Sequence, residues 1–192
     1  MAFLSLTKKA AAALGININN AVAHEYKLFD LEDWVVDIIW TNKKKNPGIL
    51  FYNRSTGFVI ALNPAEYTLD YCLEIVRQHL ARLLKEHGMD DKMAYFIDVF
   101  SVIHICKNND RSAVGYMTQS KFLVDCWLDA EYAQRVDNSY DLMKKINEDY
   151  RNIKGRYQHT RIIDFLKAVS QINDAYGITV LQTANCEKSV LH

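Results

Sequence analysis

The chain has 192 residues, 49% of them hydrophobic, and its 23 Lys and Arg balance its 23 Asp and Glu. This composition excludes wholesale disorder, and the length suits one or two small domains. A neutral chain is unlike a dedicated nucleic-acid-binding domain, and the absence of an 18-residue apolar run argues against a membrane span. Seven glycines and two prolines are few for this length, so we expect a helix-rich chain.

The N-terminal sequence lacks the pattern of a secretion signal, because Lys8 and Lys9 interrupt its apolar stretch. The cysteines form no CxxC pair of the kind that zinc ribbons and thioredoxin-like proteins carry; they are Cys72, Cys106, Cys126 and Cys186. We therefore expect a cytoplasmic chain with free thiols and without disulfides, cofactor or metal.

Strand signals dominate the first third of the chain. Residues 2–6 predict a short strand, and Thr7 predicts the N-cap of a short helix that Gly15 ends. Three β-branched and aromatic segments follow, with turn sequences between them: residues 34–40, 48–52 and 58–62. Short turns between consecutive strands predict an antiparallel meander.

Helical periodicity replaces the strand pattern after residue 62. Asn63, Pro64 and Glu66 stand at the N-cap, N1 and N3 places of a capping box, and Gly88 predicts the end of that helix. Further segments predict a helix at 90–99, a strand at 101–105 and a helix capped by Asn109 or Asp110. Apolar spacing predicts two more helices, one from Leu142 to Ile153 and one from Ile162 to Ile172.

These elements predict an α+β fold: an N-terminal antiparallel meander, amphipathic helices packed on one face of it, and a helical C-terminal half. No Pro-, Ser- or Gly-rich linker divides the chain, so residues 1–192 are expected to form one domain. A helical subdomain over residues 137–177 is the alternative. The outer edge of the short meander would permit a homodimer.

The neutral net charge hides local segregation. Residues 41–54 and 144–161 are basic, whereas residues 24–37 and 125–141 are acidic. A basic turn can hold an acidic protein partner or nucleic acid. The candidate partner-binding residues are Lys43, Lys44, Lys45, Arg54 and, as an aromatic anchor if it is exposed, Tyr52.

The junction between the strand at 101–105 and the following helix is a second candidate site. A helix N-terminus presents free N–H groups and a partial positive charge. The side chains that could complete an anion site there are those of Lys107, Asn109, Arg111 and Ser112.

Catalytic motifs are missing. The sequence contains no GxGxxG, Walker-type loop, HExxH or GxSxG. His104 and Cys106 lie on the same side of an apolar strand, where packing is the expected role. Gly115 lies inside a predicted helix, where glycine costs about 1 kcal/mol relative to alanine. Close packing is the expected reason for it.

Three segments resemble a small family of uncharacterised bacterial proteins. These are the Thr7-Lys8-Lys9 start, the meander with its basic turn, and the junction that begins at Asp110. In the junction, Arg111, Ser112, Gly115, Met117 and Phe122 fit the family pattern, while Asp110 replaces an Asn and Thr118 stands where Asn is common. The resemblance implies an α+β fold and a bacterial or mobile-element origin, without a known activity.

Three function hypotheses follow. The first is an intracellular, non-enzymatic protein-binding module, which by analogy would be a phage or plasmid accessory or anti-defence protein. The second is a weak nucleic-acid-binding protein that uses the basic turn and the 144–161 region. The third is a small anion-handling enzyme at the 107–112 junction.

Overall fold

A computed structural model describes residues 1–25, 31–39, 48–63, 66–129, 139–148, 150–151, 160–161, 163–164 and 166–167. In chain order, the elements are β1 (Ala2–Leu6), α1 (Lys8–Ala13), β2 (Asp33–Ile39), β3 (Gly48–Asn53), β4 (Val59–Leu62), α2 (Leu69–Glu86), α3 (Asp90–Val99), β5 (Ile103–Lys107), α4 (Arg111–Asp129), α5 (Ser139–Glu148), β6 (Tyr150–Arg151) and β7 (Thr160–Arg161).

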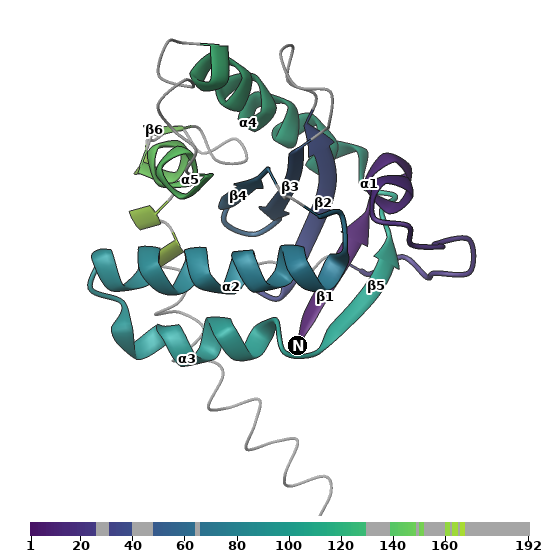
Figure 1. The fold of residues 1–192 in the computed structure, drawn as a ribbon, viewed down its shortest axis with the longest axis horizontal. Coiled ribbons are helices and arrows are strands. Elements are labelled where there is room, and N and C mark those ends of the chain that lie inside the picture. The colour runs from purple at the N-terminus through teal and green to yellow at the C-terminus, as the bar shows by residue number, and fades with distance from the viewer. Residues whose placement is uncertain are drawn as a thin grey trace, which may run out of the picture.

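One mixed sheet of five strands organises the chain, in the order β4-β3-β2-β1-β5 (Figure 1). The predicted meander is confirmed, because β2, β3 and β4 pair antiparallel. Gly48 begins β3 at a point where a Cβ would lie 2.8 Å from the Leu62 carbonyl oxygen, so glycine permits this close approach. The meander is only part of the sheet, since β1 pairs in parallel with both β2 and β5.

Helices cover both faces of this sheet, so the expectation of one-sided packing is wrong. Strand β2 is buried along its whole length. Its residues Trp34 and Val36 belong to a core shared with α2 and α3, whereas Val35 packs in a second core with Met117 of α4. A strand buried on both faces carries a continuous apolar run rather than an alternating one, which explains the sequence of β2.

Local signals define most helix boundaries. Thr7 caps α1 as predicted, with its Oγ1 accepting from the Ala10 N–H at 3.2 Å. Gly15 and Gly88 follow α1 and α2 with positive φ values of 66° and 65°, the left-handed conformation that glycine favours after a helix. Asp110 is the cap of α4, because its Oδ1 accepts from the Ala113 N–H at 3.0 Å.

Two predicted helix boundaries are wrong. Helix α2 begins at Leu69 rather than after Asn63, because Thr68 accepts a hydrogen bond from the Tyr71 N–H at 3.3 Å. An acid in the first turn, Asp70, adds a favourable interaction with the helix dipole. Helix α5 ends at Glu148, and Tyr150 belongs to β6 instead. Ile153 and most of the predicted 162–172 helix lie outside the described residues, as does most of the 137–177 subdomain.

The outer edge of the meander is covered. Asn147 of α5 accepts from the Val59 N–H at 2.9 Å and donates to the Val59 carbonyl at 2.6 Å. One buried amide thus takes both edge-facing backbone groups that a pairing strand would use. At Val59, the backbone groups that face this edge are therefore already hydrogen-bonded within the chain. No helix within the described ranges is long and apolar enough to cross a membrane.

Candidate functional site

A polar layer lies on the face of β1 and β2 that is opposite the α2–α3 core. Strand alternation places Leu4 and Trp34 in that core. The same alternation turns Ser5, Asp33 and Asp37 toward the other face, where all three side chains are buried. Burial of carboxylates is costly unless cations or hydrogen-bond donors face them, so this layer requires partners.

Arg54 is the buried cation of this layer. Its side chain is 2% exposed, and its Nη1 lies 3.4 Å from Asp33 Oδ2 and 4.0 Å from Asp110 Oδ2. Its Nη2 donates to Asn108 Oδ1 at 3.3 Å. Arg54 therefore connects the start of β2 to the β5–α4 junction, although the two segments are far apart in sequence.

The turn that carries Arg54 is itself buried, and Asn53 holds it. The Asn53 Oδ1 accepts from the Ser55 and Thr56 backbone N–H groups at 3.2 and 3.0 Å. Its Nδ2 donates to the Leu31 carbonyl at 3.0 Å. An Asx-type turn fixed on both sides in this way directs Arg54 into the protein rather than toward solvent.

A second buried acid, Asp37, connects three elements near the end of β2. Its Oδ1 accepts from the Thr7 hydroxyl at 2.5 Å, and its Oδ2 accepts from the Lys121 ammonium of α4. Thr7 is also the cap of α1, so Asp37 fixes the point where α1 leaves β1. This contact joins the first residues of α1 to the middle of α4.

Two chain segments meet at the carboxyl ends of β1 and β5. The strands run in parallel, with Leu6 opposite Lys107, and the Asn108 N–H donates to the Leu6 carbonyl at 3.0 Å. After β1 the chain enters α1, which packs in the α2–α3 core; after β5 it enters α4, which packs in the second core. The two helices therefore leave neighbouring parallel strands on opposite sides of the sheet.

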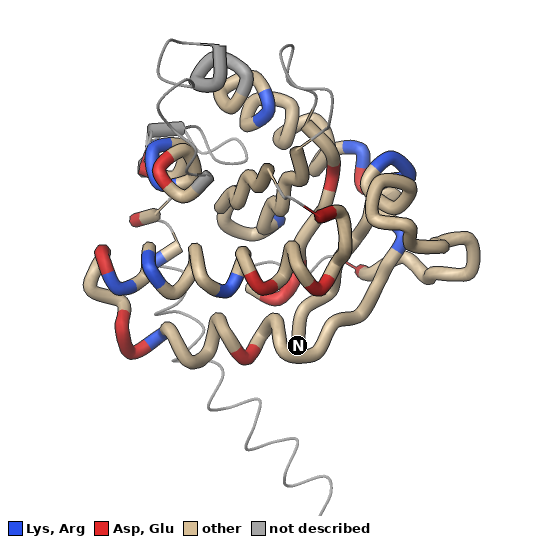
Figure 2. Tube along the Cα trace, in the orientation of Figure 1, with Lys and Arg blue, Asp and Glu red and all other residues tan. Residues whose placement is uncertain are grey.

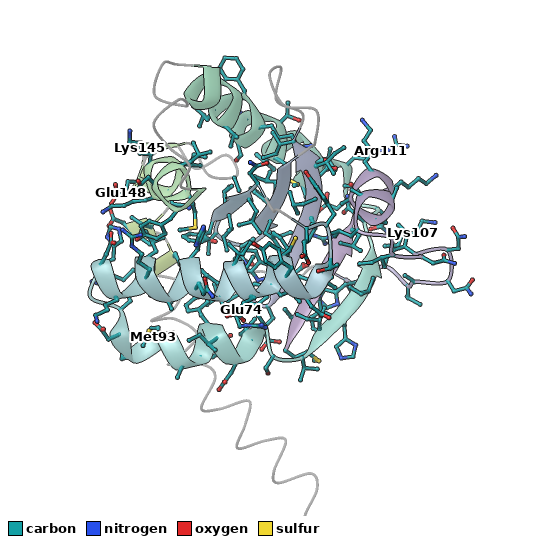
Figure 3. The ribbon with its side chains drawn as sticks, viewed as in Figure 1. Glu74, Met93, Lys107, Arg111, Lys145 and Glu148 are labelled. Atoms are coloured by element: carbon teal, nitrogen blue, oxygen red, sulfur yellow. The ribbon has the colours of Figure 1, made fainter. Side chains whose placement is uncertain are left out.

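Cations gather at this edge. Lys8 and Lys9 begin α1, Lys107 ends β5 and Arg111 begins α4, and all four side chains are exposed. We call these four residues the strand-end cations. Figure 2 shows Lys and Arg positions around α1 and the end of β5, and Figure 3 labels Lys107 and Arg111 on this side of the molecule. Within the part of the chain that the structure describes, none of the four forms an ion pair.

The residues predicted for an anion site lie together on this edge. Lys107, Asn109, Arg111 and Ser112 are all exposed at the β5–α4 junction. The acid among them, Asp110, is engaged by the Ala113 N–H and lies near the buried Arg54. The sequence alone did not predict Lys8 and Lys9 as part of this site, because their proximity to the junction depends on the β1–β5 pairing.

The predicted partner-binding patch is not assembled as expected. Lys43, Lys44 and Lys45 lie outside the described residues. Tyr52 is only 4% exposed and packs in the second core, so it is no exposed anchor. Arg54 is paired with Asp33 inside the protein. Arg54 is therefore not available at the surface as expected, and Tyr52 does not meet the condition of exposure, because β3 and the turn after it are buried.

Cys106 and His104 do not form a reactive pair. Burial raises the pKa of the Cys106 thiol, with the nearby Asp33 carboxylate raising it further, which disfavours the nucleophilic thiolate. His104 is exposed, and its ring lies 5.5 Å from that of Phe3. Among the described side chains, no group of three or more His, Cys, Asp or Glu residues could hold a metal ion.

Comparison with known proteins identifies the family. No curated protein and no solved structure matches the chain. The family model described as Domain of unknown function (DUF6933) matches residues 3–161, a range that runs from β1 to β7. This range includes all three segments on which the resemblance was based: Thr7-Lys8-Lys9, the meander with its basic turn, and the β5–α4 junction. The chain therefore belongs to the DUF6933 family of domains of unknown function.

Proposed function

We propose that this protein binds a phosphate-bearing small ligand at the carboxyl ends of β1 and β5. One observation carries the proposal: the strand-end cations come from two distant segments and meet where neighbouring parallel strands end. In open sheets with parallel strands, ligands bind outside the carboxyl ends at the point where the following helices diverge to opposite faces. The divergence of α1 and α4 creates this arrangement here.

The local charge favours an anion. Lys8, Lys9, Lys107 and Arg111 contribute positive charge without an ion-pair partner in the described part of the chain. Asp110 opposes them only in part, since its carboxylate accepts from the Ala113 N–H and lies 4.0 Å from the Arg54 guanidinium. Arg111 offers a planar fork that fits two phosphate oxygens, and the lysines act as point charges.

Neutral donors complete the proposed site. Asn109 and Ser112 are exposed on the same junction, and both side chains can donate hydrogen bonds to a phosphate oxygen. The role proposed is recognition; it retains the anion-binding part of the third hypothesis and assigns no catalytic step. Because the cations are exposed, salt screens their attraction, so binding should weaken as ionic strength rises.

The nucleic-acid hypothesis receives less support from the described residues. Arg54 is buried against Asp33, and Lys144 donates to Glu86 at 2.6 Å. Both cations are therefore already engaged, and the rest of the basic turn at 41–47 lies outside the described residues. A compact anion at the strand ends makes better use of the cations that have no ion-pair partner among the described residues.

A thermal-shift titration tests the proposal. We would measure the Tm with inorganic phosphate, pyrophosphate and ATP, using sodium chloride of matched ionic strength as the reference. A ligand at about a hundred times its Kd stabilises the folded state by about 2.7 kcal/mol, which is a readily measured shift. The paired variants Lys8→Ala/Lys9→Ala and Lys107→Ala/Arg111→Ala should each reduce that shift.

Lys85→Ala provides the matched control, because Lys85 is an exposed lysine near the end of α2. It should leave the ligand-induced shift unchanged. The absence of a shift with every phosphate compound, or equal losses in the control and the strand-end variants, would overturn the proposal.

A further inference from the structure

Gly115 has no structural reason within the described chain. It lies inside α4 and is exposed, and apart from its chain neighbours and the backbone of its own helix, no described atom lies within 4 Å of the position that a Cβ would occupy. Its φ is not positive, so the backbone conformation does not require glycine either. The expectation that close packing explains Gly115 is therefore wrong. The described residues therefore supply no reason for glycine at this position, although glycine weakens a helix interior.

Gly115 belongs to a continuous exposed face of α4. Phe122 is 66% exposed, and it lies seven residues, or two helical turns, after Gly115. Arg111 and Thr118 are exposed on the same line, at helical spacings of four and three residues. The opposite face of α4 is buried in the second core through Ala113, Met117 and Val124. We call Arg111, Gly115, Thr118 and Phe122 the outer face of α4.

We propose that the outer face of α4 binds an acidic, amphipathic helix of a partner protein. A residue without a side chain lets a second helix approach more closely than the usual 8–10 Å between axes. Phe122 would be buried against the apolar stripe of that helix, as an aromatic anchor of the kind that dominates interface energies. This inference goes beyond the proposed ligand binding. It returns to the hypothesis of protein binding, but places the binding surface on α4 instead of on the basic turn.

Charge identifies the partner's chemistry. Residues 111–124 of α4 contain no Asp or Glu, and their exposed cation is Arg111, because Lys121 is paired with the buried Asp37. At its N-terminal end the outer face continues into the strand-end cations, which are also exposed. A second copy of this face would bring like charges together, whereas an acidic helix complements them. The complementarity therefore favours an acidic partner over self-association through α4.

A displayed library of amphipathic helical peptides with varied charge tests the inference. Wild-type protein should enrich peptides that combine an apolar stripe with net negative charge. Phe122→Ala should weaken binding of the best peptide by about ten- to thirtyfold, as expected for loss of an aromatic anchor. Gly115→Leu should weaken peptide binding by a similar factor, because the leucine side chain holds the peptide away from the α4 backbone.

Controls separate docking from folding and from the ligand site. Tyr71→Ala removes an exposed aromatic from α2, on the other side of the sheet, and should leave peptide affinity unchanged. Gly115→Ala should unfold at no lower temperature than the wild type, because alanine favours a helix more than glycine does. Gly115 and Phe122 lie outside the proposed phosphate site, so pyrophosphate binding should survive both substitutions.

Three outcomes would overturn the inference. The first is a set of enriched peptides without negative charge. The second is a peptide affinity that is insensitive to both Phe122→Ala and Gly115→Leu. The third is a dimer in sedimentation measurements that Phe122→Ala dissolves, since the occupant of this face would then be a second copy of the chain.

Discussion

The charged side chains between α2 and α5 differ from those at the ends of β1 and β5. Between the helices, Glu86 accepts from Arg82 at 3.1 Å and from Lys144 at 2.6 Å. The Lys144 ammonium, followed by Tyr140 and Arg82, lowers the pKa of Glu86 to about 2. At the strand ends, Lys107 and Arg111 have no acid paired with them in the described chain.

This difference separates two uses of surface charge. We call Arg82, Glu86 and Lys144 the paired group. Its ion pairs join α2 to α5, so its charges are largely neutralised by other side chains of the protein. The strand-end cations keep their charge available to solvent and to ligands. Figure 3 places the labelled Lys145 and Glu148 of α5 on one side of the molecule and Lys107 and Arg111 on the other.

The largest effect is expected at the buried pair beneath the strand-end cations. Arg54→Met leaves the fully buried Asp33 carboxylate without its guanidinium partner. Breaking a buried pair by removing one member costs about 3–5 kcal/mol, and urea unfolding followed by circular dichroism measures the loss. The double variant Asp33→Asn/Arg54→Met should recover part of it. A loss below about 1 kcal/mol in Arg54→Met would mean that the pair does not support the junction.

A smaller effect is expected where α5 meets the sheet. Asn147→Leu removes both hydrogen bonds to the Val59 backbone. The buried N–H and carbonyl groups of Val59 then lose these hydrogen-bond partners. We expect a loss of about 1–3 kcal/mol in the free energy of unfolding. Gln78→Leu, which replaces an exposed amide on α2, is the control and should change stability by less than about 0.5 kcal/mol. Equal effects would show that the Asn147 hydrogen bonds do not anchor α5.

Local sequence signals predicted the elements better than their arrangement. The meander, the Thr7 cap and the Asp110 cap follow from the residues near each of them. The capping box at Asn63 fails because Thr68, five residues later, provides an N-cap beside an acid. Periodicity identified which helix residues are apolar, but it does not tell which face of the sheet a helix covers.

The candidate site was only half predictable, because it depends on a long-range strand pairing. The β5–α4 junction is visible in the sequence, whereas Lys8 and Lys9 join it through the parallel β1–β5 contact. The sequence did contain a signal for this pairing. The predicted strands at 2–6 and 101–105 are each followed directly by a helix, and parallel strands need such crossover connections. Arg54 was misassigned for a similar reason. Its positive charge suggested a surface patch, while its buried partner Asp33 lies in a strand that reads as apolar.

A modest, pH-dependent effect is expected in the paired group. Glu86→Gln removes the acceptor of two ion pairs and should lower stability by about 0.5–1 kcal/mol at pH 7. Because folding lowers the pKa of Glu86, its contribution is present above the unfolded value of about 4.3. That contribution is lost as the pH falls from there toward about 2. Thermal unfolding from pH 2 to pH 7 should therefore show the two proteins converging in acid.

Lys144→Gln is the companion variant in this group. It should cost about as much as Glu86→Gln at pH 7, and the double variant should cost less than the sum of the two. Strict additivity would mean that the 2.6 Å contact contributes no coupling.

The smallest effect on stability is expected at the strand-end cations themselves. Single alanine substitutions at Lys8, Lys9, Lys107 and Arg111 should each change the free energy of unfolding by less than about 0.5 kcal/mol. Removing like charges from one edge can even stabilise the fold slightly, because their mutual repulsion disappears. Urea unfolding of the four variants measures this directly. A loss above about 1 kcal/mol in any of them would reveal a structural partner for that side chain, and the contrast with the paired group would then fail at that residue.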